Sequence, residues 1–197
     1  MQKTEHKTYL HLWAVVPPPG PEQQIDQIRK EFSEQYGAVA ALKPPVHLTL
    51  YKPFSVPVAE VKKHLEKLRR LIATHPCFSL ELKNFGFFEH QSPVAFIDVA
   101  ESPELSTLND LLCAETIRLF GLQDKGRQLF HPHFTIGYRD IPGQRFPEIK
   151  RSYSARTFSA AFEVKQICLF RHNGKIWELQ HELPLAISDV AQGALWT

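Results

Sequence analysis

The sequence predicts an α+β protein of two similar lobes that share a central cleft, and three observations lead to this fold class. The same order of elements, strand, helix, strand, helix and strand, occurs twice along the chain. The middle strand of each repeat carries His, an apolar residue, Thr and an apolar residue, at 47–50 and again at 133–136. No Gly/Ser-rich linker separates the repeats. We therefore expect residues 1–197 to form a single domain of two interleaved lobes, with 188–197 as a C-terminal tail.

Composition narrows the class of protein. The chain has 197 residues, of which 43% are hydrophobic and 22% charged, as in ordinary globular domains. Its net charge of +2 is too small to predict general binding to duplex nucleic acid. Cys77, Cys113 and Cys168 are widely spaced and form no Cys-x-x-Cys pair, which indicates a reducing compartment. We expect a cytoplasmic protein with no secretion signal and no membrane association.

In the first repeat, breaker residues separate the predicted elements. One helix begins at Pro21 and ends at Gly37. A second helix starts at Val58, after Pro53 and Pro57, which are predicted to bracket a turn. Its apolar stripe consists of Val58, Val61, Leu65, Leu68 and Ile72. The predicted strands are 9–16, 46–52, 78–88 and 94–99.

The second repeat follows the same logic. Ser102, Pro103 and Glu104 supply a cap, a first-turn proline and an early carboxylate for a helix that ends at Gly121. A loop, the motif strand and a weaker helix follow, and Asn173-Gly174 predicts a tight hairpin between the last two strands. These elements are predicted at 122–130 (loop), 132–139, 146–155 (helix), 162–170 and 176–183.

The motif pair suits phosphodiester chemistry. Alternate side chains share one face of a strand, so each motif places an imidazole beside a hydroxyl. Cleaving or forming a phosphodiester needs a group that removes a proton, a group that donates one, and donors to the phosphoryl oxygens. Histidine suits both proton roles because its unperturbed pKa is about 6.5, and a threonine hydroxyl is a compact donor.

Flanking segments extend the pattern beyond the motifs. Asn84–Phe88 precedes a predicted strand as a Phe-Gly-x-Phe segment, and Phe130–His133 reads Phe-x-Pro-His before the second motif. With the two His-x-Thr motifs and the closing hairpin, the chain resembles the 2H phosphoesterase superfamily, of the 2′-5′ RNA ligase and RNA 2′,3′-cyclic phosphodiesterase type. The resemblance covers roughly residues 9–185.

This resemblance implies a structure and an activity. Each lobe would be an antiparallel sheet with helices on the outside. His47 and His133 would be the catalytic pair, and Thr49 and Thr135 would hold the phosphate. We expect hydrolysis of a 2′,3′-cyclic phosphate to a 2′-phosphate, with no metal and no cofactor. The substrate would be an RNA terminus or a small cyclic nucleotide, bound by a monomer with no obligate protein partner.

Three residues beside the motifs are candidates for substrate binding: Tyr51, Tyr138 and Arg139. Strand parity places Tyr51 on the face of His47, and Arg139 on the face of His133. Tyr138 would face away unless the strand bulges. Many relatives have Arg where this chain has Tyr138, and the first motif continues here as Tyr51-Lys52-Pro53-Phe54. These departures affect the choice of substrate more than the chemistry.

Several alternatives stay open. His131, His133 and His47 would be a zinc site if their imidazoles converged, although no Asp, Glu or Cys accompanies them at useful spacing. The same groups would also serve 2′-5′ RNA ligation, 2′-5′ phosphodiester cleavage, or binding without turnover. The sequence does not assign the acid and the base. Two further groups would contact a nucleotide or serve structure alone: the basic loop 125–128, and Phe85, Phe87 and Phe88.

Overall fold

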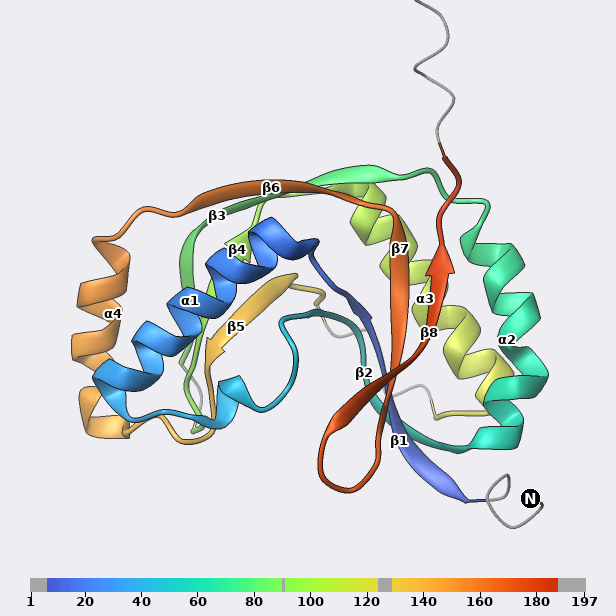
Figure 1. The fold of residues 1–197 in the computed structure, drawn as a ribbon, viewed down its shortest axis with the longest axis horizontal. Coiled ribbons are helices and arrows are strands. Elements are labelled where there is room, and N and C mark those ends of the chain that lie inside the picture. Colours follow the sequence, from blue (N-terminus) through green and yellow to red (C-terminus); the bar gives the residue numbers. More distant parts are fainter. Residues whose placement is uncertain (1–6, 90, 124–128, 188–197) are drawn as a thin grey trace, which may run out of the picture.

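The computed structural model describes residues 7–89, 91–123 and 129–187, which form one curled eight-stranded sheet with helices on its outer sides (Figure 1). The strands are β1 (Thr8–Val15), β2 (Leu48–Pro57), β3 (Phe78–Phe88), β4 (Val94–Val99), β5 (His133–Gly137), β6 (Ser159–Val164), β7 (Gln166–His172) and β8 (Trp177–Pro184). The helices are α1 (Pro19–Tyr36), α2 (Val58–Ile72), α3 (Pro103–Phe120) and α4 (Phe146–Ser154). Two short 3₁₀ helices, η2 (Ala40–Leu42) and η3 (Gly143–Arg145), complete the list.

The sheet consists of two halves joined at one point. Its order is β6-β3-β4-β5-β2-β1-β7-β8, and every pair of neighbouring strands is antiparallel. Within the described residues, the strands of the half with β3–β6 pair with those of the half with β1, β2, β7 and β8 at one position only, where Leu48 and Phe134 are register partners. The predicted α+β class is thus confirmed, and the two lobes are the halves of a single sheet.

Helices cover each half from outside. α1 packs on β5 and α4 on β3, whereas α2 and α3 pack on β2, with α2 also reaching β8 (Figure 1). The halves are interleaved because α1 follows a strand of one half and packs on the other. The approach of α1 to β5 is close: a Cβ added to Gly137 would lie 2.3 Å from Cε1 of the buried Phe32 ring. This contact holds in place the helix that carries Arg29.

The helix ends follow the predicted capping residues. Gly37 ends α1 in the left-handed conformation, with φ of 73°, and its N–H donates to the Ser33 carbonyl at 2.8 Å. The Ser102 hydroxyl accepts a hydrogen bond from the Leu105 N–H at 3.1 Å and caps α3. Gly121 ends α3 in the same left-handed region.

Two predicted boundaries are wrong. β2 continues through Pro53 to Pro57 without the predicted turn. β5 pairs with β2 only at Leu48, so this edge of β2 has no neighbouring strand near Pro53. The N–H that proline lacks is therefore not needed for a hydrogen bond there. The predicted strand 162–170 is two strands, β6 and β7, divided at Lys165. The chain crosses there between opposite halves of the sheet: β6 pairs with β3, and β7 pairs with β1 (Figure 1).

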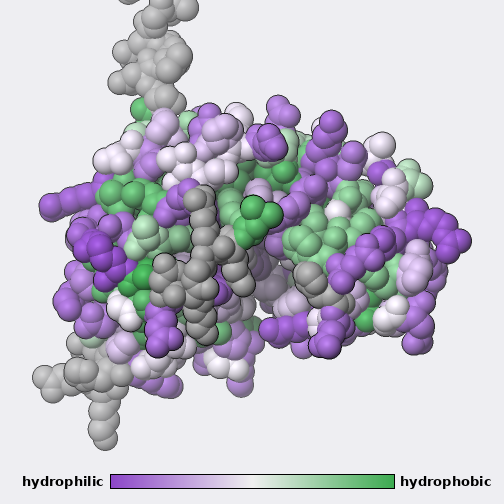
Figure 2. All heavy atoms as spheres, turned by 180° about the vertical axis from the view of Figure 1, so that it is seen from behind, coloured by the Kyte–Doolittle hydropathy of each residue, from purple (hydrophilic) through white to green (hydrophobic). Residues whose placement is uncertain are grey.

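The surface agrees with the ordinary composition. The reverse face is hollowed near its centre and has hydrophilic side chains around much of its rim (Figure 2). Within 7–89, 91–123 and 129–187, no helix is both long and apolar enough to cross a membrane.

Candidate active site

The Leu48–Phe134 pair places both motifs on one face of the sheet. Both side chains point into the core, with exposures of 0% and 1%. Because side chains alternate along a strand, the residues that flank this pair stand on the opposite, concave face. In an antiparallel register His47 lies opposite Thr135, and Thr49 lies opposite His133. The two motifs are therefore related by a local twofold axis through the Leu48–Phe134 pair.

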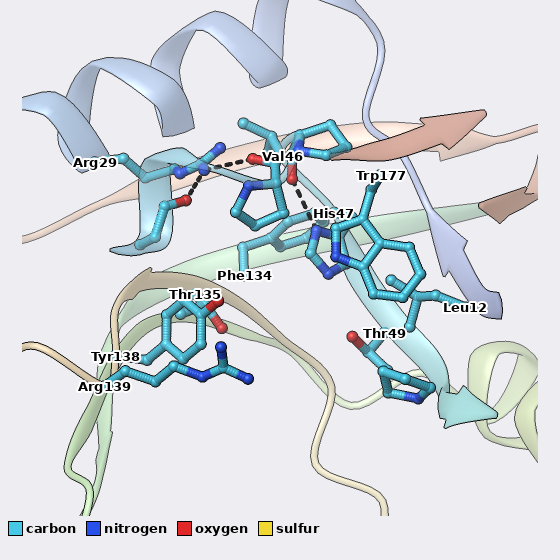
Figure 3. A pocket seen from close by; sticks show the side chains of 14 residues that line it. Leu12, Arg29, Val46, His47, Thr49, Phe134, Thr135, Tyr138, Arg139 and Trp177 are labelled. Carbon is cyan, nitrogen blue, oxygen red and sulfur yellow. Dashed lines mark hydrogen bonds between the residues drawn. The ribbon is translucent and has the colours of Figure 1, made fainter. Parts of the chain in front are cut away.

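A pocket of about 220 Å³ opens at this point (Figure 3). His47, Thr49 and Thr135 line it, while His133 stands next to Thr135 just outside the lining. The remaining lining residues are Leu12, Arg29, Ala41, Pro44, Pro45, Val46, Pro53, Phe134, Tyr138, Arg139 and Trp177. The pocket thus draws on β1, β2, β5, β8, α1 and the segment that leads from η2 into β2.

Both motif histidines are held in the same way. Nδ1 of His47 donates to the Pro45 carbonyl at 2.8 Å, and Nδ1 of His133 donates to the His131 carbonyl at 2.7 Å. Each ring is therefore anchored through the backbone two residues earlier. This bond fixes the neutral tautomer with its proton on Nδ1 and leaves Nε2 as the atom that accepts or delivers a proton.

The surroundings of the two rings differ in charge. Burial lowers the pKa of His47 below its ordinary value, and the positive charge of Arg29 lowers this pKa further. Burial also lowers the pKa of His133; the hydrogen bond to the His131 carbonyl opposes this effect, the charge of the His131 ring adds to it, and the carboxylate of Asp98 opposes it. The charges around the site therefore break the local twofold symmetry of the motifs.

His133 has a neighbourhood of rings and one carboxylate. Phe88 meets its ring edge-on at a centroid distance of 5.2 Å, and Phe96 lies at 4.9 Å. Nε2 of His131 donates to Oδ1 of Asp98 at 3.1 Å, so His131 is paired with this carboxylate. The rings restrict how His133 can turn, and the carboxylate supplies nearby negative charge.

Arg29 is a pocket residue that the sequence interpretation missed. Its side chain is 3% exposed and donates from Nη2 to the carbonyls of Ala41 and Pro44, the latter at 2.7 Å (Figure 3). These bonds hold the segment whose Pro45 carbonyl orients His47. The available signal was its position, since Arg29 falls among Ile25, Ile28, Phe32 and Tyr36 on the buried stripe of α1.

A model of the 2′-5′ RNA ligase superfamily matches residues 17–176. The chain belongs to this family. A protein of Geobacillus sp. (strain WCH70) that is provisionally named a phosphoesterase is 30% identical over 129 residues, which cover 66% of this chain and 70% of that protein. A similarly named protein of Geobacillus kaustophilus (strain HTA426) matches with the same identity and coverage. Membership of the superfamily and these names indicate phosphoesterase chemistry.

Solved structures agree with the fold of this superfamily. The protein TT0787 of Thermus thermophilus matches with a TM-score of 0.69 at 22% identity, over 91% of this chain and 99% of that one. E. coli LigT in its apo form matches with a TM-score of 0.64 at 20% identity and the same coverage. At identities of 20% and 22%, these matches show that this chain has the same fold as the two solved proteins, and they show the fold alone.

The candidate substrate residues divide between pocket and core. Tyr138 and Arg139 both line the pocket, with the Arg139 guanidinium 5.1 Å from the centroid of the Tyr138 ring. Parity does not separate them because β5 ends at Gly137. Tyr51 is not a lining residue and packs against the main core. An irregularity in the β1–β2 register pairs Thr49 with Ala14 but Tyr51 with Trp13, so the expected alternation fails between them.

The remaining candidates lie elsewhere. Phe85 and Phe87 pack against the main core, as expected for structural residues, whereas Phe88 contacts the rings of His131 and His133. Within the residues that the structure describes, no group of three or more His, Cys, Asp or Glu side chains is arranged to hold a metal ion. The basic loop 125–128 and the tail 188–197 lie outside the described residues.

Proposed function

We propose that this member of the superfamily is a metal-independent phosphodiesterase that hydrolyses a 2′,3′-cyclic phosphate, at an RNA end or on a nucleotide, to a 2′-phosphate. One observation carries the proposal. The antiparallel Leu48–Phe134 pair puts two imidazoles and two hydroxyls on one concave face in a twofold arrangement. A phosphorus atom between the motifs would have a proton-transfer group on either side.

The reaction needs only protons and water. One imidazole, acting through Nε2, removes a proton from water while the water oxygen attacks phosphorus. The P–O3′ bond breaks, and the other ring, as the imidazolium, delivers its Nε2 proton to the departing O3′. The product keeps its phosphate on O2′. Thr49, Thr135 and Arg139, which line the pocket, would donate hydrogen bonds to the phosphoryl oxygens as charge develops on them.

The charges around the rings favour one assignment of roles. The Arg29 cation beside His47 disfavours a second positive charge, which suits a base that begins neutral. The Asp98 carboxylate near His133 favours the imidazolium against the opposing charge of His131, and His47 has no such carboxylate among the causes of its shift, so His133 suits the acid better than His47 does. An anionic phosphate in the pocket would act against the burial of His133 and raise its pKa. We therefore assign His47 as the base and His133 as the acid in ring opening.

The fold relatives support a nucleotide substrate. E. coli LigT has been solved in complex with 3′-AMP, and its fold covers 91% of this chain. The same protein has been solved with phosphate. A pocket with phosphate-binding groups and room beside them for the rest of a nucleotide would suit a nucleotide ligand.

The test is turnover of a nucleoside 2′,3′-cyclic phosphate and of an oligonucleotide ending in a cyclic phosphate, with a chelator present. The wild-type protein should form the 2′-phosphate. His47→Ala and His133→Ala should each lower kcat by roughly 100- to 10,000-fold, the usual range for loss of general acid–base catalysis. His75→Ala, a histidine just after α2 and away from the pocket, serves as the matched control.

Other outcomes would change the assignment. Product that disappears with the chelator would contradict metal independence. Turnover of a 2′-5′ linked dinucleotide alone, or joining of RNA ends, would assign the same residues to 2′-5′ cleavage or ligation. Tight binding of nucleotides without any product would make the pocket a binding site rather than an active site.

A further inference from the structure

We propose that Asp98 and His131 form a support unit for His133: the Asp98 carboxylate holds the His131 side chain, and the His131 backbone holds the His133 ring. This inference rests on the proposed function, because the ring that the unit holds is the one assigned as the acid. It adds two positioning residues, which act through His133 rather than on the substrate.

Strand register places the Asp98 carboxylate beside the His133 ring. Asp98 on β4 and His133 on β5 are register partners, and so are the adjacent residues Ile97 and Phe134. Ile97 and Phe134 are buried in the core, so Asp98 and His133 stand on the opposite, concave face of the sheet. The Cβ atoms of paired residues on antiparallel strands lie about 5 Å apart. The carboxylate is therefore a direct neighbour of the second motif.

His131 links this carboxylate to the His133 ring through two hydrogen bonds. Nε2 of His131 donates to Oδ1 of Asp98 at 3.1 Å, while the His131 carbonyl accepts from Nδ1 of His133 at 2.7 Å. The same Asp98 oxygen accepts from the Val99 N–H at 3.0 Å, which ties the carboxylate to its own strand. The contacts therefore run from the β4 backbone through His131 to His133, and they leave Nε2 of His133 as the proton-transfer atom.

Two phenylalanine rings pack against both histidines. Phe88 and Phe96 each lie at a centroid distance of 5.3 Å from the His131 ring, and at 5.2 and 4.9 Å from the His133 ring. Phe96 is held in place itself, because it is buried and a Cβ added to Gly86 would lie 2.3 Å from its Cε2 atom. The two imidazoles thus share one aromatic surface, and rotation of His131 would remove part of the packing that holds His133.

The first motif is held in a different way. The carbonyl that accepts from Nδ1 of His47 belongs to Pro45, whose side chain has no hydrogen-bonding atom. The preceding carbonyl, of Pro44, accepts from the Arg29 cation. A cation therefore supports the ring assigned as the base, and a carboxylate supports the ring assigned as the acid. The two roles require this difference, since the base starts as a neutral ring and the acid as an imidazolium.

The charges that face His133 come from several elements. Asp98 on β4 and His131 before β5 act in opposite directions on its pKa, and His47 on β2 is the facing titratable group of the first motif. β3 contributes Phe88, which carries no charge. The side chains of Asp98 and His131 are 40% and 44% exposed, so solvent screens their charges. We therefore expect moderate shifts whose direction identifies the group that was changed.

The test compares Asp98→Asn with His131→Ala. Asparagine keeps the shape of Asp98 and an oxygen that accepts from His131 but loses the charge, so the basic limb of the kcat profile should move to lower pH. His131→Ala removes the opposing ring charge, so the same limb should move to higher pH. Because it also removes the bond to Asp98, it should lower kcat roughly 10-fold at unchanged KM, the lower end of the range for lost partners of functional imidazoles.

A third variant separates the bond from the charge. His131→Gln carries no charge, but its amide can donate to Asp98. It should therefore recover most of kcat while its basic limb stays at the higher pH. Glu163→Gln, which removes a half-exposed carboxylate paired with Lys165 beside β6, is the control and should change neither kcat nor the limb.

NMR titration of the His133 ring gives a readout that needs no turnover. Its midpoint, with the signal assigned by comparison with His133→Ala, should move to lower pH in Asp98→Asn and to higher pH in His131→Ala. A midpoint that stays in place in Asp98→Asn, or that moves the same way in both variants, would overturn the unit even in a protein that hydrolyses cyclic phosphates. Opposite shifts in a protein without turnover would support the unit and overturn the phosphodiesterase.

Discussion

At the scale of single residues, Arg29 determines much of the environment of His47. It donates to the carbonyls of Ala41 and Pro44, and the next carbonyl, of Pro45, accepts from His47. Its guanidinium is almost fully buried, and burial lowers its pKa, so its charge is poorly screened by solvent. We therefore expect Arg29 to act as a positioning residue that, together with burial, lowers the pKa of His47.

We expect Arg29→Gln to shift the pH profile of kcat/KM. The base must be neutral, so activity should rise with pH through the pKa of His47, which lies below its ordinary value in the wild type. Removing the adjacent cation raises this pKa, so the acid limb should move to higher pH. Initial rates measured from about pH 4.5 to about pH 8, on either side of the ordinary pKa of histidine, would show the shift.

Arg29→Lys separates charge from geometry. It keeps the cation but loses the planar fork that bonds two carbonyls, so kcat should fall while the acid limb stays near its wild-type position. Arg145→Gln, which removes a surface arginine paired with Glu148, controls for the general loss of a positive charge. An acid limb that does not move in Arg29→Gln would refute the electrostatic role.

Strand alternation and the repeated motif predicted that His47, Thr49, His133 and Thr135 share one face of the sheet, and the Leu48–Phe134 pair confirms this placement. Their catalytic roles stay a prediction, and the surroundings of the motifs could not be predicted from residue types. Tyr51 could not be placed, because the irregular pairing of β2 with β1 depends on tertiary contacts: the Leu50 carbonyl accepts from the Asn109 side chain on α3. Trp177 lies 128 residues beyond Thr49 in the sequence, and only the sheet order brings it to the pocket.

At the scale of elements, the segment from η2 to β2 connects the two lobes beside the pocket. The Asp140 carboxylate, just after β5, accepts from the backbone N–H groups of Val39 and Ala40 at 2.9 and 2.8 Å. It caps the first turn of η2 and links that turn to the second motif. The cap therefore holds the segment that ends at His47.

We expect Asp140→Ala to lower both stability and activity. Loss of such a cap costs about 1–2 kcal/mol in the free energy of unfolding. Because the same bonds fix the segment that positions the Pro45 carbonyl, kcat should also fall. Ser102→Ala removes the cap of α3, away from the pocket, and should cost about 1 kcal/mol without changing kcat. Urea denaturation and steady-state rates would separate the two effects. Equal activity losses in both variants would contradict a specific role for Asp140.

The packing of α1 on β5 leads to a prediction about stability. Any side chain at Gly137 would collide with the ring of Phe32, which has no exposed surface. Gly137→Ala should therefore lower the free energy of unfolding by about 1–3 kcal/mol, as overpacking of a core does. Thermal unfolding would measure the loss. Gly143→Ala is the control, because a Cβ there has no atom within 4 Å. A stable Gly137→Ala variant would mean that α1 moves without cost.

At the scale of the whole molecule, the sequence predicted the class and most elements but not how the halves join. Apolar periodicity and capping residues gave all four helices because these signals are local. The division of 162–170 at Lys165 was missed, since both β6 and β7 are apolar and only their partners, β3 and β1, differ. The single register pair between the halves likewise depends on tertiary structure and could not be predicted from local sequence signals. It makes the two motifs one site.

The distribution of histidines predicts how the folded protein responds to acid. His11 is 2% exposed, and burial lowers its pKa to about 4, an effect opposed by the nearby backbone of Tyr9 and strengthened by the charges of Arg171 and His181. In the unfolded chain its pKa is about 6.5, so between about pH 6.5 and about pH 4 the unfolded state binds more protons. Stability should therefore be complete above about pH 6.5 and fall as the pH drops.

We expect His11 to account for a loss of about 1–2 kcal/mol in the free energy of unfolding between about pH 7 and about pH 5. His47 and His133 should add to the loss, since burial lowers their pKa values as well. His11→Gln cannot titrate, so its stability should depend less on pH, whereas His75→Gln should follow the wild type. Urea denaturation at both pH values measures the difference. If His11→Gln and the wild type lose equal stability, His11 does not account for the acid sensitivity, which then belongs to other groups, among them His47, His133 and His181, whose pKa values burial also lowers.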